Sequence, residues 1–193
     1  KERRFTGWAD IDLTEHGKSE ARLAGQLIKE LHIEFDTYFT SVQKRAIHTI
    51  EIILNILNKK NSEIKKAWEL NERHYGALTG LSKDEMIKKH GKKQIHIWRR
   101  SFDISPPPMQ KNNPNHPSKN KAYINIPASK IPDCESLKNT FERVMPYYEK
   151  NIKPKLLSNK NILISAHGNS LRALCKNLLN ISDKKIIDFE IPT

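Results

Sequence analysis

The stretch Asn161-Ile-Leu-Ile-Ser-Ala-His-Gly-Asn-Ser-Leu-Arg172 decides the fold class. Residues 161–166 form a largely apolar run of the kind found in buried parallel strands. His167 and Gly168 follow directly, and residues 170–179 read as the next helix. In open α/β sheets, ligands bind beyond the carboxyl ends of the strands, and the free N–H groups of a helix start suit an anion. The stretch therefore predicts an α/β fold with His167 at its ligand-binding edge.

The rest of the chain supports this fold class. Apolar residues at helical spacing include Leu23, Leu27 and Leu31, and Thr14 is a typical N-cap ahead of them. We expect a strand over residues 35–41, and helices over 14–31, 43–57, 82–90, 93–100 and 135–148, the last disturbed near Pro146. Alternating strands and helices predict a three-layer domain with a mainly parallel sheet flanked by helices.

One long segment breaks the pattern. Residues 105–131 begin with Ser-Pro-Pro-Pro and continue rich in Asn, Lys and Pro, without periodic apolar residues. We interpret them as a lid or insertion loop outside the core. The length of 193 residues otherwise suits a single domain over 1–193.

Composition excludes several classes of protein. No apolar run approaches the roughly 18 residues that span a bilayer, so we expect no membrane association. Cys134 and Cys175 are the only cysteines, far apart and outside any metal-binding pattern, which argues against a disulfide scaffold or a zinc site. The net charge of +12 favours anionic partners, either nucleic acid or small phosphorylated molecules. Aromatic residues are 7% and are not interleaved with basic ones, which disfavours nucleic acid.

A second informative stretch is Leu70-Asn-Glu-Arg-His-Tyr-Gly76. Glu72 is a candidate for proton transfer to or from a hydroxyl group. Arg73, His74 and Tyr75 are candidates for hydrogen bonds to an anion. The alternative is a surface loop in which Glu72 and Arg73 pair with each other.

Arginine placement is the third feature. Arg45 lies early in an expected helix, and Arg99 and Arg100 follow Trp98. Guanidinium groups match carboxylate and phosphate oxygens in a bidentate manner that lysine cannot reproduce. Arg99 and Arg100 could equally be a solvated pair beside an aromatic ring.

Taken together, several segments resemble one family. They are residues 5–8 (FTGW), 40–46 (TSVQKRA), 70–76 (LNERHYG), 98–100 (WRR), 135–137 (ESL) and 166–172 (AHGNSLR). In this order they are similar to the cofactor-dependent phosphoglycerate mutases of the histidine phosphatase superfamily, over essentially the whole chain. The resemblance implies a cytoplasmic isomerase of glycolysis and gluconeogenesis that interconverts 3-phosphoglycerate and 2-phosphoglycerate. It also implies a homodimer or homotetramer, 2,3-bisphosphoglycerate as primer, and no metal.

The resemblance also assigns roles to residues of this chain. Glu72 resembles the general acid/base, and His167 the histidine that stabilises the transferring phosphoryl group. The ligand-contacting set carried over by motif comprises Thr6, Gly7, Arg45, Glu72, Arg73, His74, Tyr75, Lys83, Arg99, Arg100, Gly168 and Asn169. The nucleophilic histidine of the family sits in an Arg-His-Gly motif after a first strand. We expect that motif upstream of Lys1, and a further segment after Thr193.

Two other functions stay open. One is a bisphosphoglycerate mutase or phosphatase, although those relatives carry Cys-Ser where this chain has Thr6-Gly7, and Ser where it has Leu171. The other is a non-catalytic relative that acts as a binding protein, because the sequence from Lys1 onward does not contain the nucleophile motif.

Overall fold

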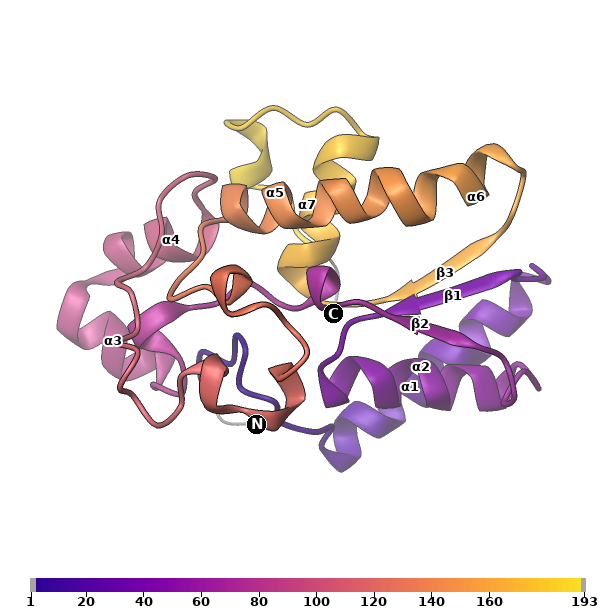
Figure 1. The fold of residues 1–193 in the computed structure, drawn as a ribbon, viewed down its shortest axis with the longest axis horizontal. Helices are drawn as coiled ribbons and strands as arrows, with labels where there is room; N and C mark the ends of the chain where they lie inside the picture. The colour runs from indigo at the N-terminus through magenta and orange to yellow at the C-terminus, as the bar shows by residue number, and fades with distance from the viewer. Residues whose placement is uncertain (1–2, 192–193) are drawn as a thin grey trace. The chain divides into compact units, whose positions relative to one another are not determined.

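The structure is a computed structural model that describes residues 3–191 (Figure 1). Lys1 and Glu2, at the start of the domain expected over residues 1–193, lie outside the described residues, as do Pro192 and Thr193. The chain divides into two compact units. The sheet unit comprises Asp10–Asn71 and Pro146–His167, and the helical unit comprises Lys1–Ala9, Glu72–Met145 and Gly168–Thr193. That the two form a single domain stays a prediction.

The sheet unit contains a parallel sheet in the order β2-β1-β3. The strands are β1 (Thr37–Thr40), β2 (Ile64–Lys66) and β3 (Ile162–Ser165). Tyr38 of β1 lies opposite Ile64 on one side and Leu163 on the other. The predicted α/β fold with a parallel sheet is confirmed. Strand β2 was not predicted because its sequence, Ile-Lys-Lys, has the lysines of an edge strand rather than an apolar pattern.

Helices cover both faces of this sheet (Figure 1). On one face, Tyr38 packs with Ile50 and Leu54 of α2 (Lys44–Ile56). On the other, Phe39 meets Tyr147 edge-on at 6.2 Å between ring centroids. The π-helix η6 (Tyr148–Ile152) and α6 (Lys153–Leu157) follow Tyr147. Successive strand residues point to opposite faces, so this alternation builds the predicted three layers.

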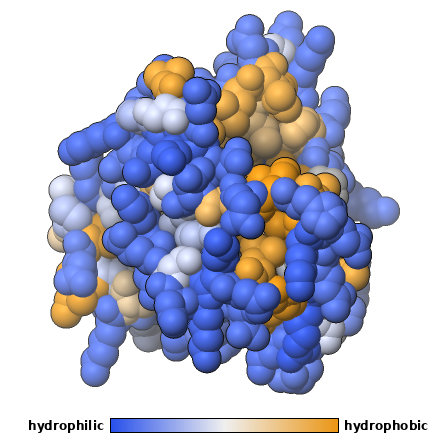
Figure 2. All heavy atoms as spheres, turned by 90° about the vertical axis from the view of Figure 1, so that its right-hand side faces the viewer, coloured by the Kyte–Doolittle hydropathy of each residue, from blue (hydrophilic) through white to orange (hydrophobic). Residues whose placement is uncertain are grey.

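Helix α1 (Glu15–Glu30) begins as predicted, with the Thr14 hydroxyl accepting a hydrogen bond from the Gly17 N–H. Its leucine stripe, however, is exposed: Leu23, Leu27 and Leu31 are each more than half accessible. The helix packs on α2 through Gly25 instead, where an added Cβ would lie 2.8 Å from Ile56 Cδ1. Figure 2 shows apolar side chains exposed in this way on a mainly hydrophilic surface.

Strand β3 differs from the expectation of a buried strand, because all four of its residues are only half-buried. The physical reason is its place in the sheet: among the described residues β3 pairs with β1 alone. Among residues 3–191 its other edge therefore has no strand partner.

The helical unit contains α3 (Lys83–His90), α4 (Lys92–Arg100), most of α5 (Leu137–Tyr147) and α7 (Gly168–Leu178). A core of Phe5, Leu78, Met86 and Ile95 holds it together. Helix α5 runs through Pro146 and changes into the π-helix η6 two residues later, close to the predicted disturbance. Short 3-10 turns complete the structure: η1 (Trp68–Leu70) in the sheet unit, and in the helical unit η2 (Gly76–Leu78), η3 (Pro117–Lys119), η4 (Lys121–Tyr123), η5 (Ala128–Lys130) and η7 (Lys185–Ile187).

Residues 105–131, all of which the structure describes, form neither an α-helix nor a strand. They nevertheless contribute to the core, contrary to the expectation that they lie outside it. Met109, Tyr123 and Ile126 are buried, and the Tyr123 hydroxyl donates a 2.6 Å hydrogen bond to the Trp8 carbonyl. Apolar residues too sparse to be periodic can still anchor a loop. That the segment acts as a lid stays a prediction.

Within residues 3–191, no helix combines the length and the apolar character needed to cross a membrane.

Candidate functional site

The Glu72 carboxylate connects two motifs that lie far apart in sequence. Its Oε1 accepts hydrogen bonds from the Arg73 N–H at 2.7 Å, from Asn169 Nδ2 at 3.0 Å and from the Asn169 N–H at 3.3 Å. Asn169 lies in the first turn of α7, where backbone N–H groups are free to bind an anion. The helix start predicted to bind an anion thus holds the carboxylate predicted to transfer a proton.

Asn169 is itself fixed by two neighbours. Its Nδ2 also donates to the Tyr75 hydroxyl at 3.2 Å, and its Oδ1 accepts from Arg172 Nη1 at 3.1 Å. Arg172 was not among the predicted site residues, although it belongs to the AHGNSLR motif. The spacing of three residues on one helix face could have indicated it.

Arg73 is fully buried, so the alternative of a surface loop with a Glu72–Arg73 side-chain pair is wrong. Its guanidinium lies 4.7 Å from the centre of the Tyr75 ring and donates through Nη2 to the Arg99 carbonyl at 2.9 Å. Its Nε and Nη1 find no hydrogen-bond partner among the described residues. A buried cation with unsatisfied donors is costly unless an anion or water compensates it.

Further cations surround this group. Burial, and next the neighbouring Arg99, lower the pKa of Lys83. Burial, followed by Arg100 and Arg73, lowers the pKa of Arg172 to about 10. Arg100 also contacts the carboxylate of Glu190. The helical unit therefore concentrates positive charge where mutual repulsion opposes it, which favours an anionic ligand.

Gly7 allows two segments to approach closely. It has φ +51°, and an added Cβ would lie 3.1 Å from the Tyr75 nitrogen and 3.3 Å from the Arg73 carbonyl oxygen. The carbonyl of neighbouring Thr6 accepts from the Ala9 N–H at 2.9 Å, which closes the turn. The FTGW segment therefore packs directly against the loop that carries Glu72.

His74 has a different environment from the other predicted ligand contacts. Its ring is fully buried edge-on to Trp8, and its Nδ1 accepts from the Gly76 N–H at 3.0 Å. Its Nε2 has no partner in the part of the chain that the structure describes. Burial lowers the pKa of His74 to about 4, so the ring is neutral at pH 7. Its contact with a ligand stays a prediction.

The sheet unit holds the remaining predicted residues, His167 and Arg45. His167 follows β3 and Ser41 follows β1, and His167 Nε2 lies 2.7 Å from Ser41 Oγ. The parallel strands end at the same edge, which explains this meeting. Ser41 Oγ also accepts from the Gln43 N–H at 3.2 Å, and Gln43 Oε1 accepts from Arg45 Nη2 at 3.2 Å. Sequence reasoning missed Ser41, although its position directly after a strand was a usable signal.

The helical unit thus brings together Gly7, Glu72, Arg73, Tyr75, Lys83, Arg99, Arg100 and Asn169, and the sheet unit brings together Arg45 and His167. Gly168 is the first residue of α7, with nothing within 4 Å of a Cβ added there.

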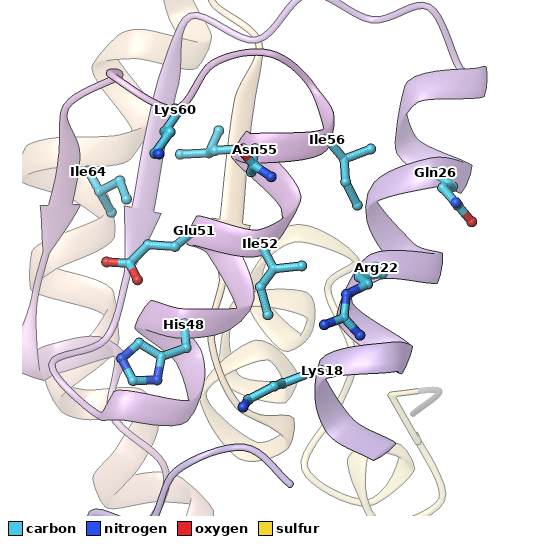
Figure 3. A pocket seen from close by; sticks show the side chains of 11 residues that line it. Lys18, Arg22, Gln26, His48, Glu51, Ile52, Asn55, Ile56, Lys60 and Ile64 are labelled. Carbon is cyan, nitrogen blue, oxygen red and sulfur yellow. The ribbon is translucent and has the colours of Figure 1, made fainter. Parts of the chain in front are cut away.

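A pocket of about 850 Å³ lies elsewhere in the sheet unit, between α1 and α2 (Figure 3). Lys18 and Arg22 on α1, and His48, Glu51 and Ile52 on α2, are among its lining residues. It contains none of the predicted site residues. The candidate site is therefore identified by its convergent polar groups and not by the size of a cavity.

Comparison with known proteins agrees with this geometry. The sequence profile of the histidine phosphatase superfamily (branch 1) matches residues 1–115, which include the loop carrying Glu72. The chain belongs to the histidine phosphatase superfamily.

Relatives within the superfamily carry a more specific name. A 2,3-bisphosphoglycerate-dependent phosphoglycerate mutase of Pelagibacter ubique (strain HTCC1062) is 55% identical over 192 residues, covering 100% of this chain and 80% of that protein. A protein of the same name from Actinobacillus pleuropneumoniae serotype 5b (strain L20) is 52% identical over 189 residues, covering 98% of this chain and 83% of that protein.

Solved structures show the same fold at lower identity. A mycobacterial glucosyl-3-phosphoglycerate phosphatase superposes with a TM-score of 0.71 at 16% identity, covering 99% of this chain and 79% of that one. Bacillus stearothermophilus YhfR superposes with a TM-score of 0.67 at 20% identity, covering 95% of this chain and 75% of that one. At such identities these structures support the superfamily fold and leave the substrate open.

Proposed function

We propose that this member of the histidine phosphatase superfamily is a phosphoglycerate mutase that interconverts 3-phosphoglycerate and 2-phosphoglycerate. The observation that carries the proposal is the Glu72 carboxylate held by Asn169 among cations. A trianionic substrate needs several cations, and phosphoryl transfer depends on positioning and on charge against the equatorial oxygens. Relatives above 50% identity with this name support the assignment.

In this reaction Glu72 moves a proton. It accepts the proton of the substrate hydroxyl as that oxygen takes up the phosphoryl group, and it returns the proton in the reverse step. Its hydrogen bonds from Arg73 N–H and Asn169 hold the carboxylate in one orientation. His167 donates a hydrogen bond to the transferring phosphoryl group, and Ser41 orients its ring. The phosphoryl acceptor on the protein, a histidine upstream of Lys1, stays an expectation.

The positive groups bind and orient phosphate and carboxylate oxygens. Lys83, Arg99 and Arg100 supply charge, and the unsatisfied nitrogens of buried Arg73 support an anionic ligand at this site. The relatives are named as 2,3-bisphosphoglycerate-dependent, and we propose that molecule as the primer, with its anionic groups bound by the same cations. When bound, it supplies the phosphoryl group that brings the enzyme into its active form.

The test is conversion of 3-phosphoglycerate to 2-phosphoglycerate with and without 2,3-bisphosphoglycerate. Glu72→Gln keeps the size of the side chain but removes the titrating carboxyl, so kcat should fall by about two to four orders of magnitude. KM should change far less. Exposed Glu63 offers the matched control, Glu63→Gln, which should leave kcat unchanged. Near-normal kcat in Glu72→Gln would place the proton transfer elsewhere.

The same assay separates the alternatives. Net synthesis or hydrolysis of 2,3-bisphosphoglycerate faster than mutase turnover would indicate a bisphosphoglycerate mutase or phosphatase. Binding of phosphoglycerate with no turnover would indicate a non-catalytic relative. The named relatives favour the mutase.

We further propose a cytoplasmic homodimer or homotetramer that works in glycolysis and gluconeogenesis. The support is the likeness to the phosphoglycerate mutases alone. Light scattering on the purified protein would give the number of subunits.

A further inference from the structure

Glu135 and Arg143 form a buried ion pair that the predicted site does not include. Arg143 Nε donates to Glu135 Oε1 at 2.6 Å, and Arg143 Nη2 donates to Glu135 Oε2 at 2.9 Å. The side chains of Arg143 and Glu135 are only 9% and 4% exposed. Arg143 lies on α5, and Glu135 belongs to the ESL segment just before that helix. This is the bidentate geometry that makes arginine–carboxylate pairs strong and directional.

The same pair holds the main chain of the loop that carries Glu72. Arg143 Nη2 donates to the Glu72 carbonyl at 3.0 Å. Glu135 Oε2 accepts from the His74 N–H at 2.8 Å, and the Glu135 N–H donates to the His74 carbonyl at 2.9 Å. Backbone groups of Glu72 and His74, on either side of Arg73, are therefore fixed to one rigid support.

A second side chain reinforces the contact at Glu72. Trp8 Nε1 donates to the same Glu72 carbonyl at 2.5 Å, and the Arg143 guanidinium lies 5.7 Å from the centre of the Trp8 ring. The Glu72 carbonyl thus accepts from two donors that pack against each other. Glu72 is therefore fixed at two points: its backbone by Trp8 and Arg143, and its carboxylate by Asn169.

Stability alone explains such a pair poorly. The desolvation of two buried charges offsets much of their attraction, and well-packed apolar residues of the same volume often stabilise a protein as much or more. Positional accuracy is a different matter, because a displacement of about 1 Å at a catalytic group can cost on the order of 100-fold in rate.

We infer that Glu135 and Arg143 are positioning residues that set the place of the Glu72 carboxylate through the Glu72 and His74 backbone. The inference rests on the proposed role of Glu72 in proton transfer. It gives the ESL segment a function for which sequence reasoning offered none.

Two conservative variants separate position from charge. Arg143→Lys keeps a cation that can pair with Glu135, but one nitrogen cannot reproduce the fork that reaches both Glu135 oxygens and the Glu72 carbonyl. Glu135→Gln keeps an acceptor for the His74 N–H and removes the charge. We expect each to lower kcat by about 10- to 100-fold and to change KM by less than about 3-fold. Exposed Glu142, next to Arg143 on α5, gives the control Glu142→Gln, which should behave as wild type.

The deciding measurement repeats Arg143→Lys in the Glu72→Gln background. If Arg143 acts through the Glu72 carboxylate, the second substitution should lower the residual kcat by less than about 2-fold, because the group it positions is gone. A general structural role would lower kcat by the same factor in both backgrounds. Near-UV circular dichroism of each variant checks the fold, and Glu135→Gln takes the place of Arg143→Lys in the cycle if the latter does not fold.

The outcomes are distinguishable. Near-normal kcat in Glu72→Gln overturns the proposed role of Glu72 in proton transfer, and this inference with it. An impaired Glu72→Gln together with an equal loss from Arg143→Lys in both backgrounds overturns the inference alone. Wild-type kcat in both Arg143→Lys and Glu135→Gln would also overturn the inference alone.

Discussion

Arg73 and Arg172 are two buried arginines of the helical unit with opposite surroundings. Arg172 donates to Asn169 Oδ1 and to the carbonyls of Phe189 and Ile186, at 3.1, 3.0 and 2.5 Å. Arg73 donates to one carbonyl and stacks on Tyr75, while its Nε and Nη1 have no partner among residues 3–191. A cation whose three nitrogens each have an acceptor within the protein serves the fold. A cation left unsatisfied at equal depth indicates charge that a ligand must supply.

The largest expected effect on ligand binding comes from the substitution that breaks the ligand side of this comparison. Arg73→Met keeps most of the volume and removes the charge, so binding of phosphoglycerate should weaken by about 30-fold or more, equivalent to about 2 kcal/mol. Stability without ligand should change by less than about 1 kcal/mol, because the lost hydrogen bond is offset by removal of a poorly compensated charge. Calorimetric titration and denaturant unfolding give the two quantities. Unchanged affinity would remove Arg73 from the ligand-binding set.

Arg172→Met tests the structural side. It removes the hydrogen bonds from Arg172 to Asn169 Oδ1 and to the carbonyls of Phe189 and Ile186, so the free energy of unfolding should fall by about 3 kcal/mol. Phosphoglycerate should bind less tightly as well, but only through looser positioning of Asn169, so the loss should be smaller than for Arg73→Met. Denaturant unfolding measures the first effect, provided that the dependence of the unfolding free energy on denaturant concentration is the same in the variant and in wild type. A variant as stable as wild type would show that the three hydrogen bonds contribute nothing net.

The same contrast shows how far the sequence could predict this molecule. Glu72, Arg73 and Asn169 follow from motifs, because a short stretch of sequence carries each one. The Arg172 and Glu135–Arg143 contacts depend on which loops the helices meet in three dimensions, and local patterns do not contain that information.

The fold shows the same division. Helices with caps and apolar spacing are predictable, and α1, α2 and α3 begin within one or two residues of their expected starts. Strand β2 has no apolar pattern and forms only because β1 offers it an edge. The leucine stripe of α1 is periodic yet exposed. The helix packs on α2 through the face that carries Gly25, because a residue without a side chain lets the two helices approach closely. Packing between elements therefore determines both the formation of β2 and the face that α1 buries.

His74 sharpens the comparison, because it too has a buried nitrogen without a described partner but is neutral. Its pKa is lowered from 6.5 to about 4, mainly by burial; the neighbouring Glu135 and Asp133 raise it, and His116 and Arg143 lower it further. Between these pH values the unfolded chain binds a proton that the folded protein does not. Stability should therefore fall by about 3 kcal/mol as the pH drops from 6.5 to 4, with no further loss from this group below that range.

His74→Asn isolates this contribution, because the Asn oxygen can still accept from the Gly76 N–H but does not titrate. We expect the variant to be less stable than wild type at pH 7, since a smaller side chain replaces a buried ring. The difference should shrink by about 3 kcal/mol as the pH approaches 4. Urea unfolding across pH 4 to 7 measures it, and a pH-independent difference would show that the pKa of His74 is the same in the folded and the unfolded chain. Phosphoglycerate titrations on the same samples test the ligand contact predicted for His74. An unchanged affinity would mean that an unpaired buried donor indicates a ligand only where, as at Arg73, it also carries charge.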